Sequence, residues 1–192
     1  MRSEGAVAAL RAATAADHDR VDALFGGYDL ADRESYARFL VAHARAVPAV
    51  ETALAAFGRL PGGVARAPLL TEDLADLDVA PPSALAFALP DDAAAGWGAL
   101  YVLEGSRLGG AMLARQVGAG LPGRYLGAGH GPGGWRAVLA GLEAAAEGSA
   151  WLERAVAAAR ATFALYGRAV EASAGKVRRR AGAGDEFPPS RR

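Results

Sequence analysis

The sequence predicts an all-α fold, and three features of its composition lead to that prediction. Alanine is the most frequent residue, isoleucine is absent, and the β-branched residues never gather into alternating runs. Alanine has the highest helix propensity, whereas strands are enriched in β-branched residues. Apolar residues instead recur at steps of three and four, the period of an amphipathic helix. A length of 192 residues suits one domain with its own core.

The first third of the chain is predicted to form two long helices. The first covers residues 5–25, and its stripe consists of Val7, Leu10, Thr14, His18, Val21 and Phe25. Gly26 and Gly27 are expected to end it. Asp32 can cap the second helix, whose stripe consists of Tyr36, Phe39, Leu40, His43 and Val47. Because proline lacks the N–H of a helical hydrogen bond, Pro48 is expected to kink or divide this helix.

The middle of the chain alternates helices with segments rich in proline and glycine. Prolines divide residues 65–90 into short helical pieces, in which we expect few functional groups. Asp91 is predicted to cap a third long helix that continues to about Val117. Residues 120–134 are loop by composition, with seven glycines and two prolines, and a helix resumes over residues 135–147.

The last predicted helix follows Ser149, which together with Glu153 resembles a displaced cap. Its stripe consists of Trp151, Val156, Phe163, Tyr166 and Val170. From residue 175 onward the chain has too little apolar content to pack against a core. We therefore predict one helical domain over residues 1–174 and a disordered basic tail over residues 175–192.

Charge and cysteine content exclude several classes of function. The 21 basic residues balance the 21 acidic ones, so no net charge draws the protein to nucleic acid or to a membrane surface. The absence of cysteine removes disulfides, thiolate metal sites and a cysteine nucleophile. No secretory signal and no run of eighteen apolar residues occurs. We expect a cytoplasmic protein without a nucleic-acid or membrane partner.

His18 is the first candidate for chemistry, because it lies on the apolar stripe of the first helix. One interpretation is a core histidine that hydrogen-bonds a neighbouring group. The other is a metal or haem ligand, since imidazole is the commonest metal ligand and a haem iron accepts one histidine. His43 and His130 have no neighbours at a metal-ligand spacing, and both are predicted to be structural or solvated.

The segment YVLEGSRLGG, residues 101–110, places three glycines in a predicted helix: Gly105, Gly109 and Gly110. Each glycine destabilises a helix by about 1 kcal/mol relative to alanine. One interpretation is a close helix crossing, where the missing side chains let two backbones approach. The other is a helix that bends and presents bare backbone to a flat ligand. The spacing alone leaves both interpretations open.

Three motifs together resemble the bacterial haem oxygenases, in particular the biliverdin-producing branch associated with bacteriophytochromes. They are LRAATAADHDRVDALF, GALYVLEGSRLGGAML and ARATFALYGRAV, and the likeness extends over residues 5–171. The resemblance implies a single-domain helical bundle in which haem lies between a proximal helix and a kinked distal helix. It favours His18 as the ligand of the haem iron.

The resemblance also assigns roles to further residues. The distal bend and the reaction cavity would consist of Gly105, Ser106, Gly109 and Gly110, with Arg107 or Glu104 helping to deliver protons. Arg11 lies seven residues before His18 and therefore about 10 Å away along the same helix face, which suits a haem propionate. The other residues expected to contact haem are Tyr125, Arg160, Phe163 and Tyr166.

The activity that the resemblance implies is oxidative cleavage of haem to biliverdin, with release of iron and carbon monoxide. Haem would be both substrate and cofactor, dioxygen would be consumed, and electrons would come from an external donor of the ferredoxin or reductase type. The alternative is a haem-binding protein of the same fold that stores, senses or transports haem without turnover.

Overall fold

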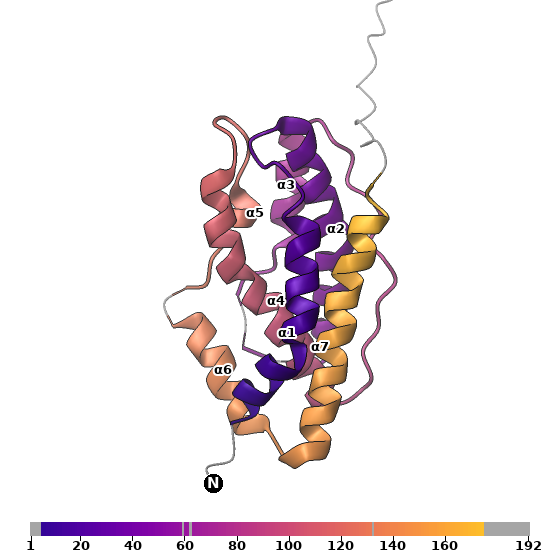
Figure 1. The fold of residues 1–192 in the computed structure, drawn as a ribbon, viewed down its shortest axis with the longest axis vertical. Helices are drawn as coiled ribbons and strands as arrows, with labels where there is room; N and C mark the ends of the chain where they lie inside the picture. Colours follow the sequence, from indigo (N-terminus) through magenta and orange to yellow (C-terminus); the bar gives the residue numbers. More distant parts are fainter. Residues whose placement is uncertain (1–4, 59, 62, 132, 175–192) are drawn as a thin grey trace, which may run out of the picture.

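A computed structural model describes residues 5–174 except 59, 62 and 132. The described residues form helices and connecting segments without a β-sheet, as the composition predicts. The helices are α1 (Ala6–Phe25), α2 (Arg33–Ala55), α3 (Ala67–Asp76), α4 (Ala93–Leu113), the 3₁₀-helix η1 (Ala114–Gln116), α5 (Arg124–Gly127), α6 (Gly134–Ala145) and α7 (Gly148–Glu171) (Figure 1). The predicted tail, residues 175–192, lies outside the described residues.

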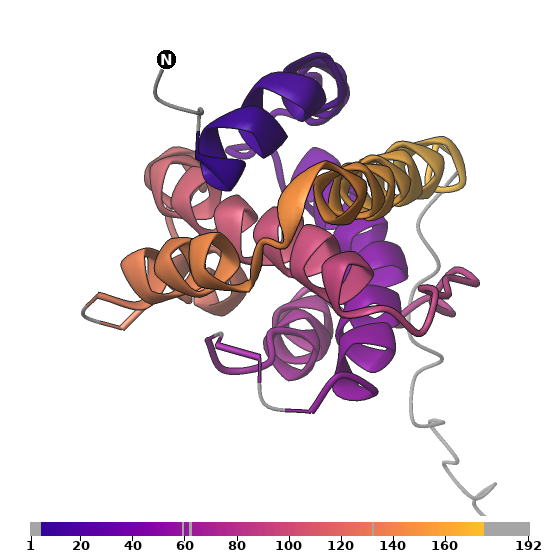
Figure 2. The same cartoon turned by 90° about the horizontal axis from the view of Figure 1, so that it is seen from below.

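Helix α4 lies in the middle of the bundle. Seen from below, α1 and α7 lie on one side of it, α2 and α3 on the other, and α6 alongside (Figure 2). Helices α4 and α7 cross very closely at Gly98. A Cβ atom added to this glycine would collide with the backbone of Ala155. Apolar side chains of α2, α4 and α7 form most of the core around this crossing. The central position of α4 makes it the frame for the other helices.

Helix starts depend on specific carboxylates. Asp32 accepts a hydrogen bond from the Ser35 amide at 2.8 Å, and this confirms the predicted cap of α2. The cap of α4 is Asp92 rather than Asp91, because the Asp92 carboxylate accepts the Ala94 amide at 2.7 Å. At α7 the predicted Ser149 cap is wrong: the helix begins at Gly148 and has no side-chain cap.

Three other segments differ from the sequence-based expectations. Pro48 lies inside α2, which continues to Ala55 without division, because both flanks of the proline are buried in the core. Residues 65–90 contain one helix, α3, rather than several pieces. The loop predicted over residues 120–134 contains the short helix α5, whose first amides at Arg124 and Tyr125 are bonded by the buried carboxylate of Asp73.

None of the helices in the described part of the chain combines the length and the apolar character needed to cross a membrane.

Candidate active site

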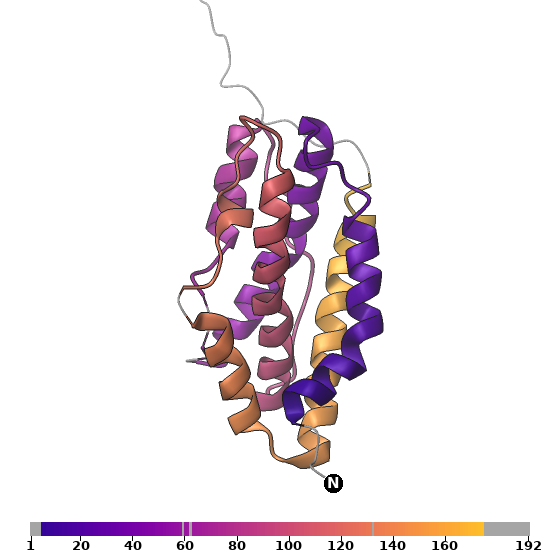
Figure 3. The same ribbon diagram turned by 60° about the vertical axis from the view of Figure 1, so that its left-hand side comes forward.

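A cavity of about 450 Å³ opens between α1 and α4. Side chains from α2, α6 and α7 and from the short helix α5 close its remaining sides, and most of the lining is apolar. Figure 3 shows α1 against α7 and apart from α4 over most of the bundle, with α6 at the lower end. The volume falls in the range of about 300–1,000 Å³ that is usual for small-molecule and cofactor sites.

His18 lies on the α1 wall of the cavity. Its Nδ1 lies 3.4 Å from Oδ2 of Asp22, one helical turn further on, and 58% of its side chain is exposed. The ring meets the Phe163 ring edge-on, with 5.9 Å between centroids. A carboxylate on the Nδ1 side leaves Nε2 for a metal, and an outer partner of this kind is usual for a histidine ligand. Arg11 lines the same wall, on the face that the spacing predicts.

Three glycines of α4 form part of the opposite wall: Gly105, Gly109 and Gly110. An added Cβ atom at Gly109 would meet nothing within 4 Å, and one at Gly105 would only touch the Trp135 ring, at 3.4 Å. At Gly98, by contrast, an added Cβ would collide with α7. Close helix packing therefore explains the glycine at position 98 but not the glycine at position 109.

Buried polar groups line the cavity beside these glycines. Arg66 Nη2 donates hydrogen bonds of 2.8 Å to the Leu103 carbonyl and to Ser106 Oγ. Arg66 Nε and Tyr166 Oη are buried, and neither has a hydrogen-bond partner among the described residues. Unpaired buried polar atoms are rare in folded proteins, so these two atoms are expected to hydrogen-bond to water or to a ligand in the cavity.

Two of the three tyrosines that line the cavity, Tyr125 and Tyr166, are uncharged donors. Burial raises the pKa of Tyr125 and of Tyr166 above the ordinary value, so both hydroxyls keep their protons at neutral pH. The Arg66 guanidinium lies over the Tyr125 ring, 5.2 Å from its centroid, and acts against this rise. Each hydroxyl therefore retains a proton that it can donate.

His43 is a second histidine in the cavity lining. Its Nδ1 lies 3.0 Å from the Phe39 carbonyl, and the Phe25 and Phe39 rings each lie 4.3 Å from its ring. Burial lowers the pKa of His43 to about 3, and the positive charge of Arg66 acts in the same direction. His43 is therefore neutral at pH 7. It lines the cavity, whereas the sequence predicted a structural or solvated histidine.

Three of the predicted site residues, Arg107, Glu104 and Arg160, lie away from the cavity lining. Arg107 is buried and paired with Glu104, with contacts of 2.8 and 3.0 Å, and its other bonds go to the carbonyls of Val64 and Ala128. Arg160 donates to the Ala13 carbonyl at 2.8 Å and lines a shallow groove between α1 and α7. The remaining predicted residues all line the cavity: Arg11, His18, Gly105, Ser106, Gly109, Gly110, Tyr125, Phe163 and Tyr166.

Arg66 and His43 are among the polar groups of the cavity that sequence reasoning missed. Arg66 lies in the proline-rich segment in which few functional groups are predicted, and no local pattern distinguishes it from a surface arginine. His43 carried a usable signal, because it shares one helix face with Phe39 and Tyr36. A polar residue on an apolar face indicates either a satisfied core position or a ligand cavity, and here it lines a cavity.

Comparison with known proteins identifies the family. No family model matches the chain. A "Heme oxygenase" of Xanthomonas campestris pv. campestris (strain 8004) is 37% identical over 121 residues, which cover 57% of this chain and 69% of the relative. The chain belongs to the haem oxygenase family. The solved structure of the NO- and CO-bound haem oxygenase from Neisseria meningitidis is also similar, with a TM-score of 0.72 and 27% identity, and the match covers 97% of this chain and all of that one.

The cavity of this haem oxygenase fits the chemistry of a haem. A porphyrin is flat and largely apolar, and the cavity has an apolar lining with side-chain-free positions on the α4 wall. The iron needs a nitrogen ligand, which His18 offers from the α1 wall. The propionates need a cation near the opening, and Arg11 lies there. The residues present therefore fit a haem.

Proposed function

We propose that this chain is a haem oxygenase that binds haem between α1 and α4 and cleaves it to biliverdin, with release of iron and carbon monoxide. One observation carries the proposal: Gly109 lines the cavity, and no atom of the described residues lies within 4 Å of the place where its Cβ would be. An alanine would give a more stable helix at such a position, by about 1 kcal/mol. The glycine is explained when the space belongs to a bound substrate.

His18 binds the haem iron in this proposal, and Asp22 orients its ring through Nδ1. Arg11 binds a propionate from the same helix face. The bound haem is both the substrate and the source of the iron at which dioxygen is reduced. The α1 wall therefore fixes the position of the iron, and it leaves the opposite face of the porphyrin to α4.

Proton delivery on the α4 side is assigned to Arg66, Ser106 and Tyr166. Ser106 Oγ accepts a bond from Arg66 and itself donates to the Leu103 carbonyl at 2.7 Å. Arg66 Nε and Tyr166 Oη are left as donors without partners among the described residues. These donors can hold water between the protein and a ligand on the iron. Arg107 and Glu104, the other candidates, support this wall from behind.

The reaction requires dioxygen and an external reductant. We propose a donor of the ferredoxin or reductase type. A one-electron carrier of this kind can dock at the cavity opening and reduce a haem that is otherwise enclosed by the protein. Assignment to the branch associated with bacteriophytochromes remains a prediction from the sequence motifs.

The competing function is haem binding without turnover. It uses the same His18 ligand, and it differs only in that the haem stays intact when its iron is reduced in air.

A haem titration followed by reduction in air tests the proposal. The unaltered protein should bind one haem with the spectrum of a histidine-ligated iron, and a reductant with oxygen should replace that spectrum by the absorbance of biliverdin. His18→Ala should lose the histidine-ligated spectrum, whereas His43→Phe should keep it. Intact haem after reduction in air would favour the binding protein. An unchanged spectrum in His18→Ala would exclude His18 as the ligand.

His18→Ala should leave the stability of the haem-free protein almost unchanged. His18 is more than half exposed, so removing its ring should change the free energy of unfolding by no more than about 0.5 kcal/mol. Urea unfolding of the haem-free protein measures this change. A large loss would mean that His18 stabilises the fold rather than a ligand.

A further inference from the structure

Trp135 forms an end of the haem cavity that no assigned role explains. It is the second residue of α6, it is half-buried, and its ring lines the cavity next to Gly105. The Trp135 ring also packs on the ring of Tyr101, with centroids 5.7 Å apart. An indole at the edge of the cavity presents a large rigid surface to whatever fills it.

His130 lies beside Trp135. The two rings lie 5.8 Å apart with an angle of 37° between their planes. Nε2 of His130 lies 3.1 Å from Oε2 of Glu104, without the alignment of a standard hydrogen bond. Burial lowers the pKa of His130, so the neutral ring carries a single N–H, which the carboxylate places on Nε2. His130 thus connects the start of α6 to α4.

Glu104 is itself held firmly, so this connection has a fixed anchor. Both of its oxygens bond Arg107, and Oε2 also accepts the Gly63 amide at 3.1 Å. Arg107 in turn bonds the Ala128 carbonyl at 3.1 Å, two residues before His130. The segment that leads into Trp135 is therefore attached to α4 at two points.

A haem has four meso carbons, and its propionates make its edges unequal. With the iron held by His18, the ring can still turn about the axis through the iron. A flexible propionate at the exposed Arg11 limits this in-plane rotation without fixing it. A rigid wall on one edge removes that freedom. We propose that Trp135 is a specificity-determining residue that sets the in-plane rotation of bound haem and thereby the meso carbon that is cleaved, and that His130 is the positioning residue that holds it. This inference rests on the proposed function.

The primary test measures the biliverdin isomers formed by Trp135→Ala. The ratio of the two main isomers should change by about tenfold, since the loss of even one methylene group in an apolar pocket changes discrimination by that factor. Trp135→Phe should change it less, because a ring remains. Trp97→Phe is the matched control: this half-buried tryptophan of α4 packs on Gly141 of α6 but does not line the cavity. It should leave the isomer ratio unchanged.

A second measurement does not depend on turnover. The proton NMR shifts of the haem methyl groups in the ferric complex report the in-plane orientation, so Trp135→Ala should change their pattern and Trp97→Phe should not. His130→Ala should change the isomer ratio in the same direction as Trp135→Ala but less, and His130→Gln, which keeps an N–H donor, should restore part of it. Faster hydrogen exchange of residues 127–135 in haem-free His130→Ala would show the lost attachment directly.

The outcomes separate this inference from the proposed function. If the unaltered protein binds no haem, the proposed function fails and the inference fails with it. If the unaltered protein binds haem but Trp135→Ala keeps the same methyl shifts and the same isomers, only the inference is wrong. Equal changes in Trp97→Phe and Trp135→Ala would also overturn it, because they would show general loosening of α6.

Discussion

The two walls of the cavity differ in how firmly the protein holds them. Eleven of the 21 residues of α4 are buried, whereas only two of the 20 residues of α1 are. The α4 wall is attached through the buried Arg107, which bonds the carbonyls of Val64 and Ala128, and through Arg66. The outer wall, α1, is attached by a few apolar side chains such as Leu10 and Phe25, by the cap that Glu143 provides and by Arg160. We infer that α4 is preformed for the substrate, while α1 completes its packing only when the substrate is bound.

The largest expected effect follows from breaking the attachment of α4. Arg107→Met should lower the free energy of unfolding by about 3–5 kcal/mol, because it leaves the buried Glu104 carboxylate without its partner. Urea unfolding measures the loss. Arg38→Met is the control, since Arg38 also pairs with a glutamate on its own helix, but at the surface. Its loss should be no more than about 1 kcal/mol. If the two variants lose the same free energy of unfolding, the inference that the protein holds α4 more firmly than α1 is wrong.

The second prediction concerns pH and the buried histidine of the cavity. Because the pKa of His43 falls to about 3 in the fold, the unfolded chain takes up a proton below pH 6.5 that the folded chain does not. The free energy of unfolding should therefore fall as the pH falls, by about 2 kcal/mol between pH 6.5 and 5. His43→Phe should lack this part of the pH dependence. A variant that keeps the same slope would show that His43 is not the cause.

The third prediction uses two glycines of α4 in opposite surroundings. Gly109→Ala should stabilise the haem-free protein by about 1 kcal/mol, because helix propensity improves and the added methyl group meets nothing. The same variant should bind haem more weakly, since the methyl group enters the cavity. Gly98→Ala should destabilise the protein, because its methyl group collides with α7. Thermal unfolding and haem titration measure both effects. A Gly109→Ala variant with unchanged haem affinity would contradict the proposed role of the space.

The sequence could predict the walls of the cavity but not what connects them. The stripe from Val7 to Phe25 and the cap near Asp92 depend on neighbours within a few positions, so local rules place α1 and the start of α4 to within one or two residues. The end of α4 at Leu113 lies four residues before the predicted end. Helix α5 depends on Asp73, a carboxylate that is distant in the sequence, and no local pattern reveals it.

The same limit applies to individual site residues. Glycines at positions 98 and 109 look alike in the sequence, and only the atoms around them show which one serves packing and which faces the cavity. The resemblance to haem oxygenases predicts that Arg107 or Glu104 helps to deliver protons at the reaction centre. The position of Arg107 on the far side of the helix turn instead directs it to Glu104, Val64 and Ala128. A role that depends on where a side chain points can be assigned only from the three-dimensional structure.

The smallest expected effect concerns the attachment of α1. Both Glu143 oxygens accept amides of the first turn, from Ala6 at 2.9 Å and Val7 at 3.0 Å, and the carboxylate lies where an added Cβ at Gly5 would be. Glu143→Gln removes a charge that favours a helix N-terminus and one of the two acceptors, so it should destabilise the protein by about 0.5 kcal/mol.

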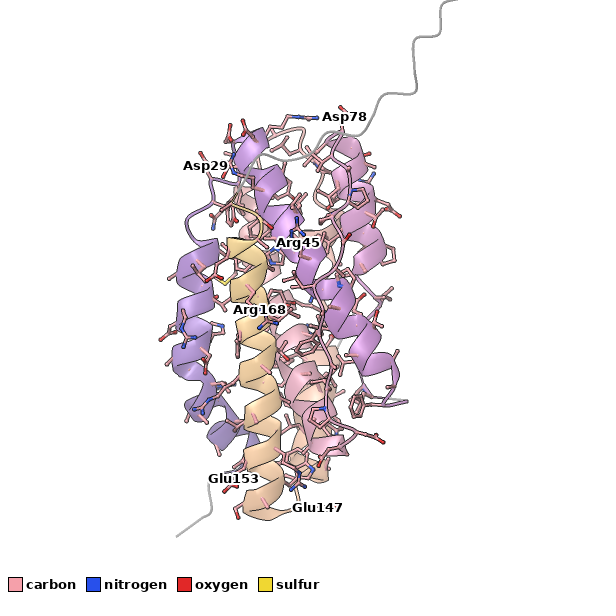
Figure 4. The ribbon with its side chains drawn as sticks, turned by 90° about the vertical axis from the view of Figure 1, so that its right-hand side faces the viewer. Asp29, Arg45, Asp78, Glu147, Glu153 and Arg168 are labelled. Atoms are coloured by element: carbon pink, nitrogen blue, oxygen red, sulfur yellow. The ribbon has the colours of Figure 1, made fainter. Side chains whose placement is uncertain are left out.

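The loss should be confined to the start of α1. Hydrogen exchange of residues 6–10 should become faster in Glu143→Gln, while exchange in α4 stays unchanged. Glu153→Gln is the matched control, because Glu153 is exposed near the lower end of α7 (Figure 4). Since bound haem adds contacts to α1, it should slow exchange in this turn again in the variant. If exchange in α4 rises together with that in α1, the two walls are coupled, and α1 is as much a part of the preformed frame as α4.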